Sequence, residues 1–389
     1  MLRRFFTHLS FFTCLLFVLA GSAARADHAA DLRAVLATIR LPPGFHISLY
    51  ALAPDARALA LSPDGKTLIV GTMGDSVHRV SVGAETAAKV EAFAPGAGFV
   101  MPNGPCFAPD GDVFIAEFNR IRRFTHRPDG WDATLPHDIV APGALIPPSE
   151  ISHVHGARVC RVGPDGKLYV TIGQPDNVPT PARNSFYEKA GMGAIIRMNS
   201  DGGNREVYAS GIRNSVGLDF DPRDGTLWFT DNQADWMGDD IPPGEINRAT
   251  KPGQNFGFPY YGGGSVRTKP YAAMTPPGDV VFPMVEEVAH AADLGMIFYR
   301  GAQFPMEWRG IFSAQHGSWN RSTPVGGRVM FTPLRADGAG PSIPFAEGWN
   351  IGKRHYMGRP VDVVELRDGS LIVSDDQEGA LYRIFYDGK

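Results

Sequence analysis

Short apolar runs recur along the chain, and each follows a turn that contains Asp and Gly and usually Pro. A second apolar run precedes each turn, so every unit has two β-type runs joined by a tight connection. Five copies are clear, and their second runs are residues 67–70, 113–116, 168–171, 227–230 and 371–374. Runs of this length flanked by Asp-Gly turns are typical of β-hairpins. The pattern therefore predicts repeated pairs of antiparallel strands.

The spacing of these units predicts the architecture. The turn aspartates are Asp64, Asp110, Asp165, Asp224 and Asp368, which are separated by 46, 55, 59 and 144 residues. The long last interval leaves room for one or two weaker units, and residues 310–314 and 328–331 supply runs for one of them. Such a period suits a four-stranded blade better than a helical repeat. We predict an all-β fold, a six-bladed β-propeller of four-stranded antiparallel blades, closed by residues 380–384 pairing near residues 45–47.

The N-terminal segment has the pattern of a secretory signal. Arg3 and Arg4 precede an apolar run over residues 9–21, and Ala24-Arg25-Ala26 has small residues at both positions of a cleavage site. An uncleaved anchor is the alternative, but the run is short for a membrane span. We therefore assign residues 1–26 to a signal peptide and residues 27–389 to one propeller domain. We expect a periplasmic or secreted protein that does not span the membrane after cleavage.

Composition and charge narrow the function classes. The chain is 43% hydrophobic and 20% charged, which is enough apolar material for a buried core. Its net charge is -4 and becomes -7 once Arg3, Arg4 and Arg25 are removed with the signal peptide. The chain has no basic tract, so we expect no nucleic-acid partner.

Two cysteines remain in the mature chain. Cys106 and Cys160 precede their turns by similar distances, so neighbouring strands and a disulfide are one interpretation. Buried free thiols are the other, and we favour free thiols. The motif Cys-x-x-Cys-His is missing, so we expect no c-type haem on this chain.

Polar residues precede the clear turns by about 7–11 positions. In a propeller the first strand of each blade lines the central channel, so these positions gather at one mouth. They are Arg57, Asn103, His155, Arg158, Arg213, Asn214 and Arg359. Each alone has a structural explanation, such as capping a blade turn. Together they predict a cationic mouth that suits an anionic ligand, with a neutral imidazole, His155, as a proton-accepting base.

A second polar cluster follows residues 227–230. Carboxylates and amides are dense between residues 231 and 247, and oxygen-rich loops suit a hard cation such as Ca²⁺. The ligand spacing of an EF-hand is missing, and a solvated acidic loop explains the pattern equally well. Residues 175–192 and 236–270 are too long for simple turns, and loops of this length are often functional. His153, His290 and His316 lack the spacing of a zinc-binding helix.

These motifs together resemble a known family. Segments in matching order are LPPGF at 41–45, PNG at 102–104, HxxR at 155–158, GIRN at 211–214, WFTDN at 228–232, GDDxPP at 238–243, QHGSW at 315–319, GRPV at 358–361 and SDD at 374–376. They resemble the glucose/sorbosone dehydrogenases, soluble enzymes that use pyrroloquinoline quinone (PQQ), and are most similar to the L-sorbosone branch. The family fold is a six-bladed propeller.

The resemblance implies a PQQ and a Ca²⁺ ion at the channel mouth. It implies His155 as catalytic base with Arg213 beside the quinone. The implied cofactor-binding residues are Asn103, Arg158, Asn214, Arg321 and Arg359, and the implied metal-binding residues are Gln233, Ala234 and Asp235. For Gln233 and Ala234, the family's metal ligands are backbone oxygens.

The chain departs from the glucose-oxidising members at three positions. Gln174 stands where they have the Asp that orients the base, and Asp176 is the candidate replacement. Val361 stands where they have the second Arg of an Arg-x-Arg pair. Arg321 or Arg328 takes the place of their cofactor-binding Lys.

We therefore expect a dehydrogenase that oxidises a sugar or a sugar-derived aldehyde or alcohol with PQQ and Ca²⁺. His155 takes the hydroxyl proton, and the electrons pass to a separate acceptor such as a cytochrome or a quinone. Two alternatives stay open. A metal-dependent lactonase on the same fold needs no quinone, and a non-enzymatic propeller uses the arginines to hold an anionic ligand.

Overall fold

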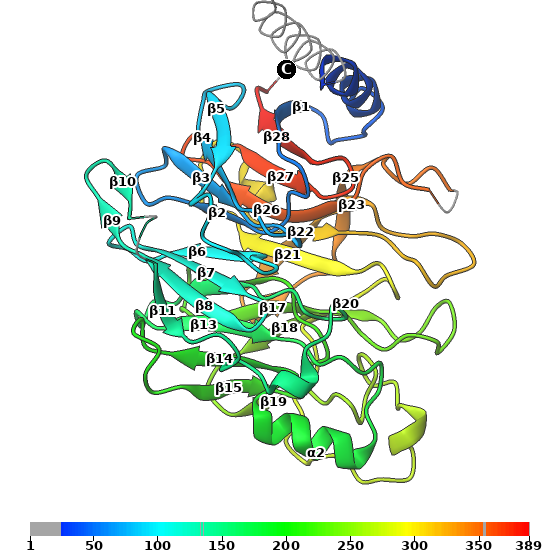
Figure 1. The fold of residues 1–389 in the computed structure, drawn as a ribbon. Coiled ribbons are helices and arrows are strands. Elements are labelled where there is room, and N and C mark those ends of the chain that lie inside the picture. Colours follow the sequence, from blue (N-terminus) through cyan, green and yellow to red (C-terminus); the bar gives the residue numbers. More distant parts are fainter. Residues whose placement is uncertain (1–24, 133, 135, 353–354, 389) are drawn as a thin grey trace, which may run out of the picture.

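Six mainly antiparallel sheets form the blades, and a two-stranded ribbon is added to them, so the predicted six-bladed β-propeller is confirmed (Figure 1). The computed structural model describes residues 25–132, 134, 136–352 and 355–388. One cavity of about 360 Å³ opens at the Asp-Gly end of the channel. The first strand of every blade contributes to its wall; examples are Leu59, Cys106, Arg161, Asp219, Ile297 and Val364.

The first three blades follow one another along the chain. Blade 1 contains β2 (Leu59–Leu61), β3 (Thr67–Val70), β4 (His78–Ser81) and β5 (Lys89–Ala92). Blade 2 contains β6 (Gly104–Phe107), β7 (Val113–Glu117), β8 (Arg120–Phe124) and β11 (His137–Val140), with a ribbon of β9 (His126–Arg127) and β10 (Gly130–Trp131). Blade 3 contains β12 (Cys160–Val162), β13 (Leu168–Ile172), β14 (Ala194–Met198) and β15 (Glu206–Ser210).

The last three blades complete the ring. Blade 4 contains β16 (Leu218–Phe220), β17 (Leu227–Asp231), β18 (Gly244–Ala249) and β20 (Val285–Glu287), while β19 (Gln254–Asn255) joins blade 3 beside β15. Blade 5 contains β21 (Asp293–Phe298), β22 (Gly310–Gln315), β23 (Arg328–Arg335), β24 (Gly338–Ala339) and β25 (Ile343–Glu347). Blade 6 contains β26 (Pro360–Glu365), β27 (Leu371–Asp375), β28 (Ala380–Tyr386) and β1 (Phe45–Leu52).

The repeated turns have one local geometry. In each, the Asp carboxylate accepts a hydrogen bond from the backbone N–H two residues later; the residues are Asp64, Asp110, Asp165, Asp224 and Asp368. The glycine that follows each Asp has φ between 72° and 93°. Asp favours this local hydrogen bond and Gly adopts positive φ without a Cβ clash, which explains the repeated Asp-Gly pair.

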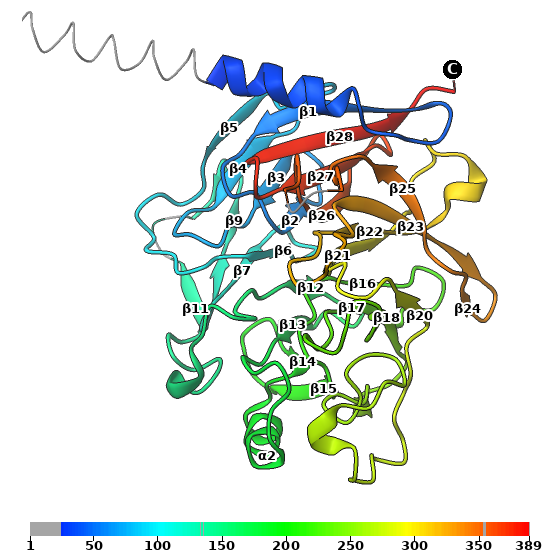
Figure 2. The same cartoon turned by 90° about the vertical axis from the view of Figure 1, so that its right-hand side faces the viewer.

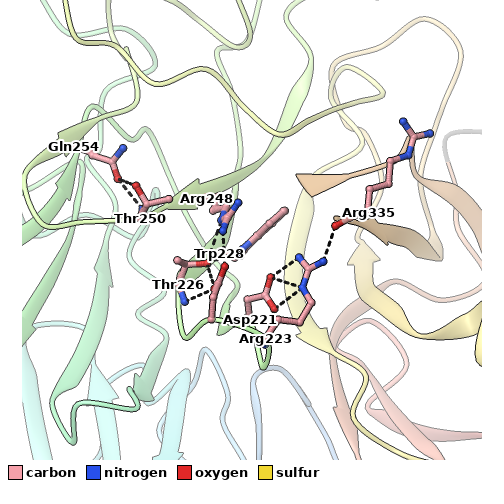
Figure 3. A network of polar contacts seen from close by, with 9 residues as sticks. Asp221, Arg223, Thr226, Trp228, Arg248, Thr250, Gln254 and Arg335 are labelled. Carbon is pink, nitrogen blue, oxygen red and sulfur yellow. Dashed lines mark hydrogen bonds and ion pairs between the residues drawn. The ribbon is translucent and has the colours of Figure 1, made fainter. Parts of the chain in front are cut away.

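Polar contacts tie the fourth of these turns to the strands around it (Figure 3). Thr226 Oγ1 accepts a hydrogen bond from Arg248 Nε of β18 at 3.1 Å. Arg223 pairs with Asp221 and donates to the backbone oxygen of Arg335, in β23 of the next blade, at 2.6 Å. The turn is thereby connected across the boundary between blades 4 and 5.

Hydrophobic clusters lie between neighbouring blades, one at each of the six boundaries among the described residues. In β3, Leu68 and Val70 belong to the cluster against blade 6, while Ile69 belongs to the cluster against blade 2. Successive side chains of a strand point to opposite faces, so both faces of β3 are buried. This is why the apolar runs are continuous rather than alternating.

The N-terminal strand closes the ring, as predicted. β1 pairs antiparallel with β28, and Phe45 and Ile47 lie opposite Tyr386 and Ile384. Figure 2 shows β1 and β28 side by side, with the helical residues 25–36 above them. Leu32 and Leu36 of that helical segment pack into the cluster between blades 5 and 6.

The two mature cysteines form a disulfide, so the expectation of free thiols is wrong. Cys106 of β6 and Cys160 of β12 are bonded, with their Cα atoms 5.6 Å apart. These strands are the innermost strands of adjacent blades and lie side by side along the channel, which brings the two Cβ atoms within bonding reach.

Two long connections differ from a simple loop. The first contains the helix α2 (Pro181–Ala190), whose N-cap Thr180 accepts a hydrogen bond from Arg183 N. The second, residues 236–270, was predicted as a loop but contains β18 and β19. Polar side chains interrupt the apolar ones in β18, so no apolar run marks the strand.

Three short 3-10 helices complete the elements: η1 (Pro148–Glu150), η2 (Lys269–Tyr271) and η3 (Met306–Trp308). The predicted signal peptide, residues 1–26, lies outside the described residues except for Arg25 and Ala26. In the part of the chain that the structure describes, every helix is too short or too polar to cross a membrane.

Candidate functional site

Hydrogen bonds connect the polar residues at the channel mouth across blades 2 and 3. Arg158 is 1% exposed, and its Nη1 donates to the backbone oxygen of His155 at 3.1 Å. Asn103 Nδ2 donates to the backbone oxygen of Arg158 at 2.9 Å. Burial lowers the pKa of Arg158 to about 10. Arg158 and Asn103 therefore act as internal ties that fix the segment before β12.

The same chain of contacts continues through blades 1, 6 and 5. Asn103 Oδ1 accepts from Arg57 Nε at 3.0 Å, and Arg57 forms an ion pair with Asp376. Asp376 Oδ1 lies 2.8 Å from His316 Nε2, and the backbone oxygen of His316 accepts from Arg359 Nε at 3.0 Å. Burial opposes the charge of Asp376, but His316 and the two arginines hold its pKa well below the usual range.

His155 has an unusual backbone conformation, and its ring has one hydrogen-bond partner among the described residues. Its φ is 55°, and its Nδ1 lies 2.6 Å from the backbone oxygen of Gln174. Burial, followed by the charge of Arg213, lowers the pKa of His155 to about 3. A Cβ on Gly173 would lie 2.6 Å from Asn214 Oδ1 and 2.9 Å from His155 Cβ, so only glycine fits beneath the imidazole.

His155 lines a cavity of about 190 Å³ at this mouth. Four other predicted site residues also line it: Arg213, Asn214, Gln233 and Asp235. The structure therefore brings the predicted base together with the predicted quinone-facing and metal-binding segments from blades 3 and 4.

Arg213 is held rigidly at the cavity wall. Its Nη2 donates to Asp235 Oδ2 at 2.7 Å and to Asn177 Oδ1 at 3.0 Å, and its Nη1 donates to the backbone oxygen of Asn232 at 3.2 Å. Asp231 accepts from its backbone N at 3.0 Å. Burial lowers the pKa of Arg213, and the carboxylates of Asp235 and Asp231 oppose that change. The guanidinium thus supplies a fixed positive charge beside His155.

Asp235 joins three loops. Its backbone N donates to Asn177 Oδ1 at 2.7 Å, and its Oδ1 accepts from Asn320 Nδ2 at 2.8 Å. Its neighbour Ala234 is fully buried and donates its N–H to the backbone oxygen of Gly262 at 2.9 Å. The predicted metal-binding segment is therefore fixed by contacts with residues far away in the sequence.

Part of the acidic segment is buried, so the solvated-loop alternative is wrong for that part. Asp231 is at the end of β17 and Glu245 is in β18, and Gln233 Nε2 donates to both, at 2.9 and 2.7 Å. Burial raises the pKa of both carboxyl groups. Asp240, by contrast, is exposed.

Four predicted cofactor-binding residues do not line the cavity: Asn103, Arg158, Arg321 and Arg359. Arg321 donates to Asp240 Oδ1 at 3.0 Å and to the backbone oxygen of Ala289 at 3.3 Å. Arg359 Nη2 donates to the backbone oxygen of Gly317 at 2.7 Å. For Asn103, Arg158 and Arg359, the distance from a turn predicted the mouth of the channel but not the direction of the side chain, whereas Arg321 was implied by the resemblance alone.

Asp176 does not take the place of the missing base-orienting Asp. Its carboxylate accepts from Tyr187 OH at 3.0 Å and lies 3.5 Å from Arg183 Nε, both in α2. The backbone oxygen of Gln174 holds the imidazole instead.

Several cavity residues have no assigned role in the sequence prediction: Asn232, His290, Trp319 and Asn320. Trp319 and Trp236 are 61% and 72% exposed, and their ring centroids are 5.0 Å apart. Trp319 belongs to the QHGSW motif at 315–319 and Asn320 follows it, so this motif could have indicated both residues from the sequence. Among the described residues, no three His, Cys, Asp or Glu side chains are grouped as metal ligands.

Comparison with known sequences shows which family the site resembles. Residues 144–318, which contain His155, Arg213 and Asp235, match the family described as Glucose / Sorbosone dehydrogenase. This segment is similar to the glucose/sorbosone dehydrogenases. The resemblance inferred from the sequence motifs is therefore confirmed over this part of the chain.

Two curated relatives are uncharacterized proteins. A protein of Borreliella burgdorferi is 37% identical over 251 residues, which cover 63% of this chain and 64% of the relative. A protein of Synechocystis is 30% identical over 172 residues, which cover 39% of this chain and 40% of the relative. The chain thus spans less than two thirds of the length of either relative.

Solved structures with the same fold include sugar-oxidising enzymes. The calcium structure of a Trichoderma reesei carbohydrate-active enzyme has a TM-score of 0.74 at 17% identity, covering 90% of this chain and 97% of that one. The PQQ domain of Coprinopsis cinerea pyranose dehydrogenase has a TM-score of 0.71 at 18% identity, covering 89% and 97%. The soluble aldose sugar dehydrogenase of Escherichia coli has a TM-score of 0.63 at 18% identity, covering 88% and 100%. At these identities the likeness concerns the fold.

Proposed function

We propose that the protein is a quinoprotein sugar dehydrogenase that uses PQQ and Ca²⁺. The observation that carries this proposal is His155, an imidazole of lowered pKa beside the fixed charge of Arg213 in a cavity within the family segment. A neutral imidazole next to a cationic group suits proton removal from an alcohol with an anionic cofactor nearby.

The cavity residues fit a cation. Four of them have a buried side-chain oxygen that no described residue donates to: Asn214 Oδ1, Gln233 Oε1, Asp293 Oδ2 and Asn320 Oδ1. Unsatisfied buried acceptors are costly, and oxygen donors of this kind are those that Ca²⁺ prefers. The donor chemistry supports a hard cation or a ligand that brings its own donors.

We assign the following roles to residues of this chain. Gln233 and Ala234 would hold Ca²⁺ and Arg213 and Asn214 would lie at the quinone. When bound, PQQ would supply a hydride acceptor and Ca²⁺ would supply Lewis-acid polarisation. His155 Nε2 accepts the proton of the substrate hydroxyl, and the C–H electron pair of the same carbon leaves as hydride. Arg213 stabilises the negative charge that develops in this step.

The rim of the cavity supports a sugar as the substrate. Trp236 and Trp319 expose most of their indole surface next to each other, and Trp319 lines the cavity. Large aromatic faces offer apolar area at little conformational cost, and the C–H face of a sugar ring is the complementary surface. We propose that a sugar or sugar-derived aldehyde is oxidised at this rim and that the electrons pass to a separate acceptor.

We also propose that the protein acts in the periplasm or outside the cell. Its N-terminal sequence has the pattern of a signal peptide, and the Cys106–Cys160 disulfide is typical of an oxidising compartment.

A reconstitution experiment tests the function. Purified protein is titrated with PQQ in the presence and absence of Ca²⁺ and followed by calorimetry, and dye reduction is then assayed over a panel of sugars and aldehydes. We expect saturable, Ca²⁺-dependent PQQ binding and sugar-dependent dye reduction. Lactone hydrolysis by the Ca²⁺-loaded protein without PQQ would instead favour the lactonase, and PQQ binding without turnover of any substrate would favour a binding propeller.

A further inference from the structure

We propose that Gln174 is the positioning residue for His155. Its backbone oxygen fixes the imidazole as the Nδ1–H tautomer, and its side chain holds that oxygen in place. The catalytic meaning of this inference rests on the proposed function, but the tautomer itself is a property of the protein without any cofactor.

The contact between the two residues determines the tautomer. A backbone carbonyl only accepts hydrogen bonds, so the 2.6 Å contact to the Gln174 oxygen requires a proton on His155 Nδ1. In the neutral ring the lone pair then lies on Nε2, which makes no hydrogen bond to any described residue. Because His155 lines the cavity, Nε2 is the ring atom left to accept a proton there.

The Gln174 side chain fixes its own backbone. Gln174 is 2% exposed, and its Nε2 donates to the backbone oxygen of Asp176 at 2.6 Å while its Oε1 accepts from the Asp176 N at 3.0 Å. Gln174 N also donates to the backbone oxygen of Arg213 at 3.3 Å. These contacts need a side chain that both donates and accepts, which an amide does and a carboxylate does not.

The charged groups around His155 show why it matters that its Nδ1 partner, the Gln174 backbone oxygen, is neutral. The charged groups that face it are Arg158, from its own segment, and Arg213, from the next blade. The nearby carboxylates contact other groups. Asp235 forms an ion pair with Arg213, and Asp231 accepts a hydrogen bond from the Arg213 backbone N. Asp176 accepts a hydrogen bond from Tyr187 of α2. Without a carboxylate on Nδ1, the protonated imidazole gains no ion pair, so His155 releases its proton easily between turnovers.

The first test reads the tautomer directly. Protein labelled with ¹⁵N at histidine is examined without PQQ by long-range ¹H–¹⁵N spectroscopy, and the signal that disappears in His155→Gln is assigned to His155. We expect the Nδ1–H pattern in the wild type and a mixture of tautomers in Gln174→Met, which has a similar shape but no hydrogen bonds. An Nε2–H pattern in the wild type, or an unchanged tautomer in Gln174→Met, would overturn the proposal.

Two further variants separate positioning from general structural damage. Asp176→Asn alters a side chain that faces α2 and keeps the backbone groups that Gln174 uses, so it should retain the wild-type tautomer. Gln174→Glu keeps the length of the side chain but replaces the amide by a carboxylate, which cannot donate to the backbone oxygen of Asp176, so it should also give a mixture of tautomers. An unchanged tautomer in Gln174→Glu would count against the proposal.

Steady-state kinetics of the Gln174 variant link the tautomer to the reaction. We expect Gln174→Met to lower kcat by about 100-fold, the size of a misplaced catalytic group, with little change in KM or in PQQ affinity. A wild-type kcat in a variant with mixed tautomers would overturn the positioning role. If the wild type reduces no dye at all, the proposed function fails while the spectroscopic result still decides the tautomer.

Discussion

Two imidazoles at the channel mouth have different partners, and the difference separates their roles. His316 Nε2 contacts Asp376, which also pairs with Arg57, so His316 is part of the ring of contacts that connects the blades. His155 contacts a neutral backbone oxygen through Nδ1 and leaves Nε2 without a partner among the described residues. Of these two imidazoles, only that of His155 lies in the wall of the 190 Å³ cavity.

Replacing His155 tests the base. We expect His155→Ala to lower kcat by about 100- to 10,000-fold, the usual contribution of a general base, with PQQ binding retained. Steady-state dye reduction and calorimetry measure the two effects. His153→Ala is the matched control, since His153 stacks on Phe118 at a centroid distance of 5.6 Å and has no role in the proposed chemistry. Full activity of His155→Ala would reject the assigned base.

The lowered pKa of His155 predicts an unusual pH dependence. Because the folded-state pKa is about 3 rather than 6.5, the imidazole stays neutral as the pH falls through the range where histidine normally protonates. The acid limb of kcat/KM due to His155 should therefore lie below pH 5. An acid limb near pH 6.5 that is present in the wild type and is lost only when His155 is replaced would contradict this prediction.

The same shift has a consequence for stability. In the unfolded chain His155 binds a proton below about pH 6.5, whereas the folded protein resists it, so the free energy of unfolding falls as the pH drops from 6.5 towards 3. His155→Gln should be less sensitive to acid than the wild type. Urea unfolding at pH 7 and pH 5 measures the difference between the two proteins.

At the scale of elements, the segments before each first strand place the site residues, and contacts between blades hold these segments. β12 follows the segment of His155 and Arg158, and a disulfide joins it to β6, which follows Asn103. The site thus depends on the relative position of two adjacent blades as well as on its own residues.

Removing the disulfide tests this dependence. We expect the double variant Cys106→Ala with Cys160→Ala to lose about 2–4 kcal/mol of unfolding free energy, because the bond closes a long loop in the unfolded chain. Urea unfolding of the variant and the oxidised wild type gives the value. The reduced wild type is the control, since it loses the bond but keeps both side chains. Equal stability of all three forms would contradict a structural role.

At the scale of the whole molecule, one blade is built from both ends of the described chain. β1 supplies the outer strand of blade 6, and Phe45 packs against Phe304, Phe345 and Tyr386 at centroid distances of 4.8 to 4.9 Å. The ring is closed by this packing, far along the chain from the cavity residues of blades 3 and 4.

A substitution at the closure should affect stability but not chemistry. We expect Phe45→Ala to lower the unfolding free energy by about 3–5 kcal/mol, as for other buried aromatic residues. The KM for the sugar substrate should stay near the wild-type value below the unfolding transition. Thermal unfolding and steady-state kinetics measure the two effects, and an unchanged Tm would show that the closure does not limit stability.

The sequence by itself determined the blades and their order. Asp-Gly turns and continuous apolar runs depend on local conformation and on burial of both strand faces, so they are visible in the residues themselves. Closure by residues 45–47 and 380–384 followed from the same pattern. His155, Arg213 and Asn214 also meet in one cavity, as their spacing from the turns predicted. Gln233 and Asp235, which the family resemblance implied, line the same cavity.

Only the tertiary structure decided which polar groups face one another. Gln174 holds His155 through its backbone, which no side-chain pattern marks, and Asp176 turns towards α2 instead. Cys106 and Cys160 pair because their strands are neighbours along the channel. β18 is a strand because its backbone pairs with β17 and β20, and Gln233 donates a hydrogen bond to its buried Glu245. Local patterns determine elements, whereas the partners of buried polar groups depend on how those elements pack.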